Sequence, residues 1–231
     1  MGKRVAIIQS NYVPWKGYFD LIGLADELIL YDEVQYTKND WRNRNRIKTA
    51  NGVAWLTIPI RLSGRFGQRI CDTEVEDGRW RRKHWATLAQ SYARAPFFDT
   101  YRADFEQAYL QQEEPMLSKI NRSFIELACR LLGIRTRISW SLDYESGTGK
   151  SEKLVRLCKA VGGTEYLSGP AARAYIDAGV FAKEGITLRY MDYSGYPEYP
   201  QLHGGFEHAV SVLDLLFNTG PDARKYMKHV T

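Results

Sequence analysis

The sequence predicts an α/β fold with a parallel sheet, and two observations near its start carry this prediction. Residues 5–8 are four apolar residues between polar ones, the pattern of a buried strand, and their composition suits a parallel sheet covered on both faces. A turn with Pro14 and Gly17 follows, then a helical apolar spacing over residues 18–25 and a second strand over residues 27–31. Strand, turn, helix and strand in this order are typical of an open α/β sheet.

Polar residues follow both strands, at residues 9–11 and 32–45. In open α/β sheets, ligands bind beyond the carboxyl ends of the strands, so we expect one crevice there. The side chains expected to line it are Gln9, Asn11, Tyr12, Asp32, Gln35 and Arg42.

The segment over residues 37–51 is dense in Arg, Asn and Lys, and it leads through an Asn-Gly turn to a strand over residues 53–60. We predict that it is an ordered connection between two strands. Arg and Asn together suit phosphate or carboxylate recognition, so an anion is expected near Arg42, Arg44 or Lys48. The alternative is an internal salt network with the carboxylates Asp32, Glu33 and Asp40.

Three amphipathic helices are predicted next, over residues 76–93, 101–112 and 116–132. Gly133 suits the end of the third helix. The basic, Gly-containing stretch at residues 61–69 is either a lid over a phosphate or a flexible connection. His84 lies in the first of these helices, and it is either an acid/base group or a structural histidine.

Residues 146–151 look like a phosphate-binding P-loop between a strand at residues 134–142 and a helix at residues 152–161. Tyr144, however, stands where that motif needs a glycine, so we do not predict a P-loop NTPase. A phosphate at the N-terminus of the helix remains physically reasonable.

The C-terminal part is predicted to hold a strand, a helix, a strand and a closing helix, over residues 164–169, 171–177, 186–190 and 209–218. Gly220 caps the closing helix. The aromatic loop at residues 193–205 contains Tyr196, Tyr199 and Gln201, which suit stacking on a sugar or a base. The alternative is that the loop only covers the core.

The composition is that of an ordinary globular protein, with 231 residues of which 44% are hydrophobic and 26% charged. A net charge of +5 favours a small phosphorylated ligand, and no nucleic-acid-binding motif is present, so no nucleic acid polymer is expected as a partner. The three cysteines have no spacing of a disulfide framework or a zinc site. With no signal peptide and no apolar run as long as a membrane helix, we expect a cytoplasmic protein without a membrane partner.

Several motifs together resemble the WbqC-like protein family. They are residues 9–19 (QSNYVPWKGYF), 32–48 (DEVQYTKNDWRNRNRIK), 55–59 (WLTIP), 166–169 (YLSG), 199–201 (YPQ) and 211–218 (SVLDLLFN). Ser10 departs from the family pattern, which usually has proline there. The resemblance covers essentially the whole chain and implies one domain, 1–231.

That family is similar to proteins encoded among surface-polysaccharide and antibiotic-sugar genes. The resemblance implies an enzyme, a transferase in surface-polysaccharide (O-antigen) or modified-sugar biosynthesis that acts on a sugar nucleotide. One form of the reaction is transfer of an acyl or aminoacyl group to an amino sugar. The alternatives are a nucleotidyltransferase-like enzyme that uses ATP as its cofactor and a non-catalytic binding factor of the same pathway.

The nucleotidyltransferase alternative comes from a more distant likeness. Residues 14–18 occupy the place of the His-x-Gly-His turn of nucleotidyltransferases, and Ala25-Asp26 matches the dipeptide before their second strand. The likeness implies a Rossmann-like, nucleotidyltransferase-like parallel sheet with additional C-terminal α/β and helical elements. Trp15 and Tyr18 stand where those enzymes have histidines, so their mechanism of adenylyl transfer is not implied.

From the residues and the resemblance together, Asp32 and His84 are the predicted catalytic groups, and no metal ligands are predicted. A homodimer is also expected. The predicted substrate-binding residues are Gln9, Asn11, Tyr12, Trp15, Tyr18, Gln35, Tyr36, Asp40, Trp41, Arg42, Asn43, Arg44, Lys48, Ser168, Gly169, Tyr199 and Gln201.

Overall fold

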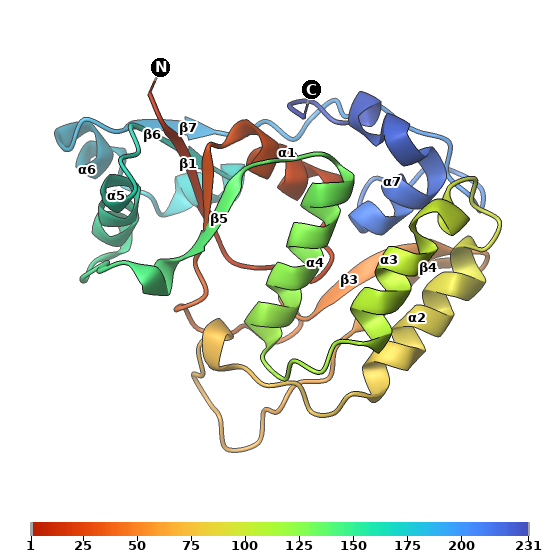
Figure 1. Ribbon diagram of the computed structural model, residues 1–231. Coiled ribbons are helices and arrows are strands. Elements are labelled where there is room, and N and C mark those ends of the chain that lie inside the picture. Colours follow the sequence, from red (N-terminus) through yellow and green to blue (C-terminus); the bar gives the residue numbers. More distant parts are fainter. Residues whose placement is uncertain (1, 231) are drawn as a thin grey trace.

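A five-stranded parallel sheet organises the computed structural model, which describes residues 2–230 (Figure 1). Its strands lie in the order β5-β2-β1-β6-β7, and every neighbouring pair is parallel. Counted in chain order within the sheet, this is 3-2-1-4-5, which matches the first five strands of the doubly wound dinucleotide-binding order. The predicted α/β class with a parallel sheet is confirmed. The strands are β1 (Arg4–Ile8), β2 (Glu27–Leu30), β5 (Arg137–Trp140), β6 (Glu165–Ser168) and β7 (Thr187–Tyr190).

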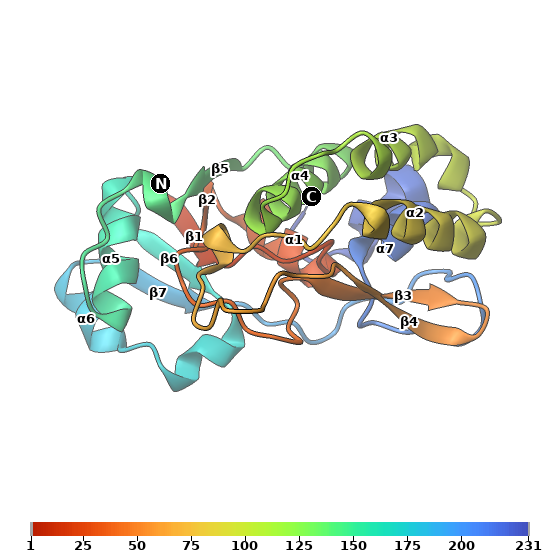
Figure 2. The ribbon, with the colours of Figure 1, turned by 90° about the horizontal axis from the view of Figure 1, so that it is seen from below.

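Helices cover both faces of the sheet, as the apolar run of β1 predicts. Ala6 points into the core shared with α1 (Lys16–Leu24) and α4 (Leu117–Leu131), whereas Val5 and Ile7 point into the core shared with α5 (Lys150–Ala160) and α6 (Ala178–Lys183). Figures 1 and 2 show the two helix pairs on opposite sides of the strands. Because successive side chains alternate between faces, all must be apolar in such a strand.

About half of the basic segment at residues 37–51 is itself a strand, so the prediction that the whole segment connects two strands is wrong. Its second part forms β3 (Arg44–Thr49), which pairs antiparallel with β4 (Gly52–Thr57) in a hairpin separate from the main sheet. The sequence of β3 does not show the alternation of apolar and polar residues that marks a strand, because one inward position is the polar Asn45. Its Nδ2 donates to the carbonyls of Tyr12 and Val13, each at 3.0 Å. A buried amide with backbone partners therefore replaces the apolar residue that would have revealed the strand.

The hairpin packs against α2 (Arg79–Tyr92) and, from the far end of the chain, α7 (Val212–Thr219) (Figure 2). α3 (Phe98–Leu110) packs in turn against α2, α4 and α7. Gly133, with φ 64°, ends α4 as predicted: Ile134 N–H donates to the Cys129 carbonyl and Gly133 N–H to the Arg130 carbonyl.

Two C-terminal elements differ from the prediction. The predicted helix at residues 171–177 is a 3-10 turn over Pro170–Ala174, and the helix that does form is the unpredicted α6. Asp177 caps α6 by accepting from the Gly179 N–H at 2.8 Å, so a helix start lies where an end was predicted. None of the helices formed by residues 2–230 is long and apolar enough to cross a membrane.

Candidate functional site: a cleft at the carboxyl edge of the sheet

A cleft of about 620 Å³ opens where β1 and β6 end. The chain leaves these neighbouring strands toward opposite faces: α1 follows β1 on one side, and the 3-10 turn and α6 follow β6 on the other. This divergence leaves space at the sheet edge, the usual ligand position in doubly wound folds. The residues that line the cleft are Ile7, Ile8, Gln9, Tyr31, Val34, Arg42, Lys150, Ser151, Leu154, Tyr166, Ser168, Gly169, Ala171, Ala172, Tyr175 and Ile176.

Two cationic side chains, Arg42 and Lys150, line this cleft from different segments. The Arg42 guanidinium donates to the side-chain oxygens of Asn11 and, at 3.3 Å, of Gln9, and it lies 3.8 Å from the Asp40 carboxylate. Lys150 is exposed, and its ammonium makes no hydrogen bond or ion pair within residues 2–230. An anionic ligand between them would contact one cation that neighbouring side chains already hold and one that is free to pair with it.

Lys150 is also the first residue of α5, so the N-terminus of that helix faces the cleft. Gly149 precedes it with φ 89°, a left-handed conformation that glycine adopts without strain. The Ser151 hydroxyl accepts from the Asp177 N–H at 2.9 Å, which ties the start of α5 to the start of α6. The helix dipole and Lys150 both favour negative charge at this end of the cleft.

Tyrosine rings form part of the remaining wall. Tyr166 is buried, and its hydroxyl donates to the Ile7 carbonyl at 3.3 Å. Tyr175 is 61% exposed at the rim; partial burial raises its pKa, and the nearby charge of Arg42 opposes the rise. Together with Tyr31, these rings offer flat apolar surface next to the two cations.

Asp32 lies behind the cleft wall and is only 1% exposed. One carboxylate oxygen accepts from the Ser10 N–H at 2.8 Å, and the other has no hydrogen-bond partner among residues 2–230. Burial raises the pKa of this carboxyl group, and Ser10 and Arg42 oppose the rise. Asn121 donates to the Ser10 hydroxyl at 3.1 Å and to the Arg42 carbonyl at 2.9 Å. Asp32 and Asn121 therefore hold the turn after Gln9, and Asn121 also holds the separate segment that carries Arg42.

The expectation that Tyr12 lines the crevice is wrong. Tyr12 is fully buried, and its hydroxyl bonds His84 Nδ1 at 2.9 Å and the Tyr109 hydroxyl at 2.7 Å. The Tyr12 ring packs between α2 and α4, with its centre 6.0 Å from that of Trp80 and 5.6 Å from that of Phe124, and the chain turns at Val13 with φ 35°. Burial lowers the pKa of His84 to about 4, so the imidazole is neutral near pH 7. His84 lies apart from both the cleft and Asp32, beside a different pocket.

Gln35 also lies outside the crevice, contrary to expectation: it is exposed and pairs its backbone with Arg69. Its neighbour Tyr36 is buried in the core. The basic stretch at residues 61–69 holds its arginines in ion pairs, Arg61 and Arg65 with Glu74 and Arg69 with Asp72. None of these residues lines the cleft.

The basic residues of the hairpin do not converge on one anion site. The Arg44 guanidinium lies 4.2 Å from the ring centre of Trp55, and Asn43 is buried with its Nδ2 bonded to the Ile58 carbonyl. The Lys48 ammonium donates to Gln201 Oε1 at 2.9 Å and to the carbonyls of Gly204 and Gly205. The alternative for this segment was an internal salt network with Asp32, Glu33 and Asp40. Of that network, the described residues of the segment form only the Arg42–Asp40 ion pair.

Tyr199 and Gln201 belong to a buried network around Asp214. The Asp214 carboxylate accepts at 2.8 Å from the Tyr92 hydroxyl, the Tyr199 hydroxyl and Gln201 Nε2. Ser168 and Gly169, by contrast, line the cleft, whereas Tyr18 donates to the Gln9 carbonyl at 3.1 Å from behind it. Trp15, Trp41 and Asn11 line a second, smaller pocket.

Sequence could not identify the cleft residues Tyr31, Lys150 and Tyr175 as a group, because they come from three distant segments. The one available signal was the P-loop-like stretch that ends at Ser151. No group of three or more His, Cys, Asp or Glu side chains within residues 2–230 is placed to hold a metal ion.

Comparison with known proteins gives two matches. The family model described as the WbqC-like protein family matches residues 9–226, and this confirms the resemblance seen in the motifs. A protein of Mycobacterium tuberculosis (strain ATCC 25618 / H37Rv), itself described as uncharacterized, is 48% identical over 227 residues, which is 98% of each chain. No solved structure matches the chain.

Proposed function

Because the chain belongs to the WbqC-like protein family, we propose that it is a transferase of surface-polysaccharide or modified-sugar biosynthesis that binds a sugar nucleotide in the β1–β6 cleft. The observation that carries the proposal is the convergence of Arg42 and Lys150 at the carboxyl edge of a sheet with doubly wound strand order. Three free cysteines are compatible with the reducing cytoplasm, where the proposal places the protein.

The cleft has the size and the chemistry for such a ligand. Its volume of about 620 Å³ lies within the ~300–1,000 Å³ of small-molecule sites. The phosphates would lie between Arg42 and Lys150 at the start of α5, and the nucleoside would lie along Tyr31 and Tyr175. Gln9 and Ser168 would supply neutral hydrogen bonds beside the phosphates.

The proposed reaction is transfer of a small acyl or aminoacyl group to the amine of an amino sugar. The amine nitrogen attacks the carbonyl carbon of an activated acyl donor, a carbon–nitrogen bond forms, and the bond to the donor's leaving group breaks. The nitrogen releases its proton to water, and the leaving group departs with the bonding electrons. Asp32 holds the Ser10 turn and faces Arg42 from behind, so we assign it a positioning role.

Calorimetric titration with a panel of UDP-, GDP-, dTDP- and CMP-sugars tests the binding step. Arg42→Met and Lys150→Met should each weaken binding of the preferred sugar nucleotide by about tenfold and flatten its salt dependence, because a phosphate contact is lost. Lys159→Met is the matched control, since Lys159 lies at the other end of α5 in an ion pair with Glu184. Unchanged affinity in both cleft variants, or no binding by the unmodified protein, would contradict the proposal.

A nucleotidyltransferase-like enzyme that uses ATP is the second candidate, and the strand order and the lysine at the start of α5 favour it. Against it, Trp15 and Tyr18 do not face the cleft. ATP belongs in the same titration panel. Binding of ATP without any sugar nucleotide would favour this candidate, and binding of a sugar nucleotide with no transfer of any acyl donor would favour a non-catalytic factor.

A further inference from the structure

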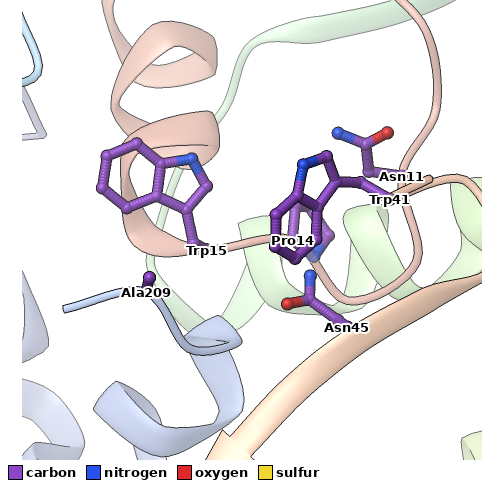
Figure 3. Close-up of a pocket in the computed structure, with 6 residues that line it drawn as sticks. All are labelled: Asn11, Pro14, Trp15, Trp41, Asn45 and Ala209. Carbon is purple, nitrogen blue, oxygen red and sulfur yellow. The ribbon is translucent and has the colours of Figure 1, made fainter. Parts of the chain in front are cut away.

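A second pocket, of about 240 Å³, lies beside the turn that follows β1, and Figure 3 shows its lining. The indoles of Trp15 and Trp41 stand on either side of it, with Asn45 below Trp41 and Ala209 below Trp15 in this view. We propose that this pocket binds one uncharged pyranose ring. The full lining is Asn11, Pro14, Trp15, Trp41, Asn45 and Ala209.

Neighbouring side chains hold both indoles in place. Trp15 makes edge contacts with Tyr193 and Tyr196, at 5.2 and 5.6 Å between ring centres. Trp41 lies 5.6 Å from Trp55, and the Arg46 guanidinium lies 5.9 Å from the Trp41 ring. Trp41 is nevertheless 41% exposed, so a large apolar face is kept open to a ligand. Fixed, exposed aromatic faces suit the apolar C–H face of a sugar ring at low ordering cost.

The two carboxamides of the lining have fixed orientations. Asn45 Nδ2 donates to two backbone carbonyls, and its Oδ1 accepts from the Arg46 N–H at 2.8 Å, which leaves one lone pair of that oxygen. Asn11 Oδ1 accepts from Arg42, so its NH₂ group points elsewhere, and this group has no partner among residues 2–230. The pocket therefore offers one acceptor and one donor, the pair that sugar hydroxyls require.

The pocket excludes other ligand classes by charge and size. None of its lining residues is charged, so it has no group to hold a phosphate. Its volume of about 240 Å³ is below the ~300–1,000 Å³ of drug-sized sites, too small for a nucleotide. A single uncharged ring fits these limits, and the donor and acceptor of the two carboxamides favour a pyranose among such rings.

The pocket adjoins the β1–β6 cleft through one side chain. Arg42 lines the cleft and donates both to Gln9, which lines the cleft, and to Asn11, which lines the pocket. The role of this pocket in a transferase rests on the proposed function, whereas the binding of a pyranose ring does not. The pyranose is then either the sugar of the nucleotide bound in the cleft or that of a separate acceptor saccharide.

Saturation-transfer NMR with methyl N-acetyl-β-D-glucosaminide and methyl β-D-glucopyranoside tests the pocket without any nucleotide. The unmodified protein should transfer saturation to the ring protons of at least one glycoside. Trp41→Ala and the pocket-filling Ala209→Leu should abolish the transfer. Phe66→Ala, which removes a fully exposed ring outside the pocket, should keep it. No transfer in the unmodified protein, or transfer that survives both pocket variants, would overturn the inference.

Calorimetry with UDP and with UDP-N-acetylglucosamine then separates the two sources of the ring. If the ring belongs to the nucleotide, Trp41→Ala weakens the affinity for UDP-N-acetylglucosamine by about tenfold and leaves the affinity for UDP unchanged. If it belongs to an acceptor, both affinities stay unchanged while the glycoside signal is lost. Failure of every sugar nucleotide of the panel to bind, with an intact glycoside signal, would reject the proposed function and leave the pyranose pocket standing.

Discussion

The ammonium of Lys16 donates to the backbone carbonyl of Pro197 at 2.9 Å and so ties the first helix to the C-terminal aromatic loop. The ring centres of Tyr196 and Tyr199 each lie 5.0 Å from the same nitrogen. Lys16 is 3% exposed, and this burial lowers its pKa to about 8, although Asp20 opposes the shift. The aromatic loop is thus fastened around a buried cation.

Lys16 should give the protein a pH dependence of stability in the alkaline range. Its folded pKa of about 8 lies below the ordinary lysine value of 10.5, so between these values the unfolded chain binds more protons than the folded one. The free energy of unfolding contributed by Lys16 therefore rises as pH rises through this window. The Tm of the unmodified protein should increase relative to that of Lys16→Met as the pH is raised from 7 to 10, as measured by thermal unfolding of both. A constant difference would mean that Lys16 does not titrate there.

The network around Asp214 should make the aromatic loop a structural cover. Tyr199→Phe removes a hydrogen bond to a buried carboxylate, worth about 2 kcal/mol, or about 4–8 °C in Tm for a chain of this size. The affinity for a sugar nucleotide should stay unchanged, since Tyr199 lies outside the cleft. Tyr175→Phe, at the exposed rim, is the control and should leave Tm within about 1–2 °C. A loss of nucleotide affinity with an intact Tm in Tyr199→Phe would make the loop a binding element.

Asp20 in α1 should anchor residues 228–230. Its carboxylate accepts from the backbone N–H groups of Lys228, His229 and Val230 at 2.8, 2.8 and 3.1 Å. Asp20→Asn places an amide donor against one of these donors and should speed hydrogen exchange of the three amides by about tenfold or more, at a cost of about 1–3 kcal/mol. Asp222→Asn, which only breaks an exposed pair with Lys225, should change neither quantity. Protection that persists in Asp20→Asn would show that packing alone holds this segment.

The three free thiols should be unreactive in the folded protein. Burial raises the pKa of Cys71 to about 11 and that of Cys129 and Cys158 to about 12, and Asp72 adds to the rise at Cys71. Because the thiolate is the nucleophile, iodoacetamide near pH 7.5 should label none of them quickly in the native state and all three in urea. Mass spectrometry of the labelled protein reads this out. Native labelling of Cys129 or Cys158 would indicate local opening of α4 or α5.

The sequence predicted best where local pattern and burial agree. The apolar run of β1, the helix and strand after it and the glycine end of α4 all lie where the pattern put them, within a few residues. The hairpin strand β3 was missed because a polar residue, Asn45, fills an inward position. The helix α6 was missed because this stretch contains two start signals. Pro170 begins only a 3-10 turn, and Asp177 caps the start of α6.

The site was predicted only in part, for a topological reason. Gln9, Arg42, Ser168 and Gly169 do line one cleft, but the sequence placed it between β1 and β2. The strand that forms the other side is β6, and nothing local shows that residues 165–167 pair with residues 4–6. The inward position of Tyr12 depends on partners far along the chain, His84 and Tyr109, which the local sequence does not signal.

The pairing of β1 with β6 also bears on how the chain folds during synthesis. Val5 pairs with Glu27 on one side and with Tyr166 on the other. At about 5–20 residues per second, the ribosome adds the intervening segment over roughly 10–30 s, during which one edge of β1 is without its strand partner. Such an open, apolar edge invites pairing with another chain. Aggregation of nascent chains, and relief by chaperones that hold short apolar segments, should therefore depend on how fast translation reaches β6.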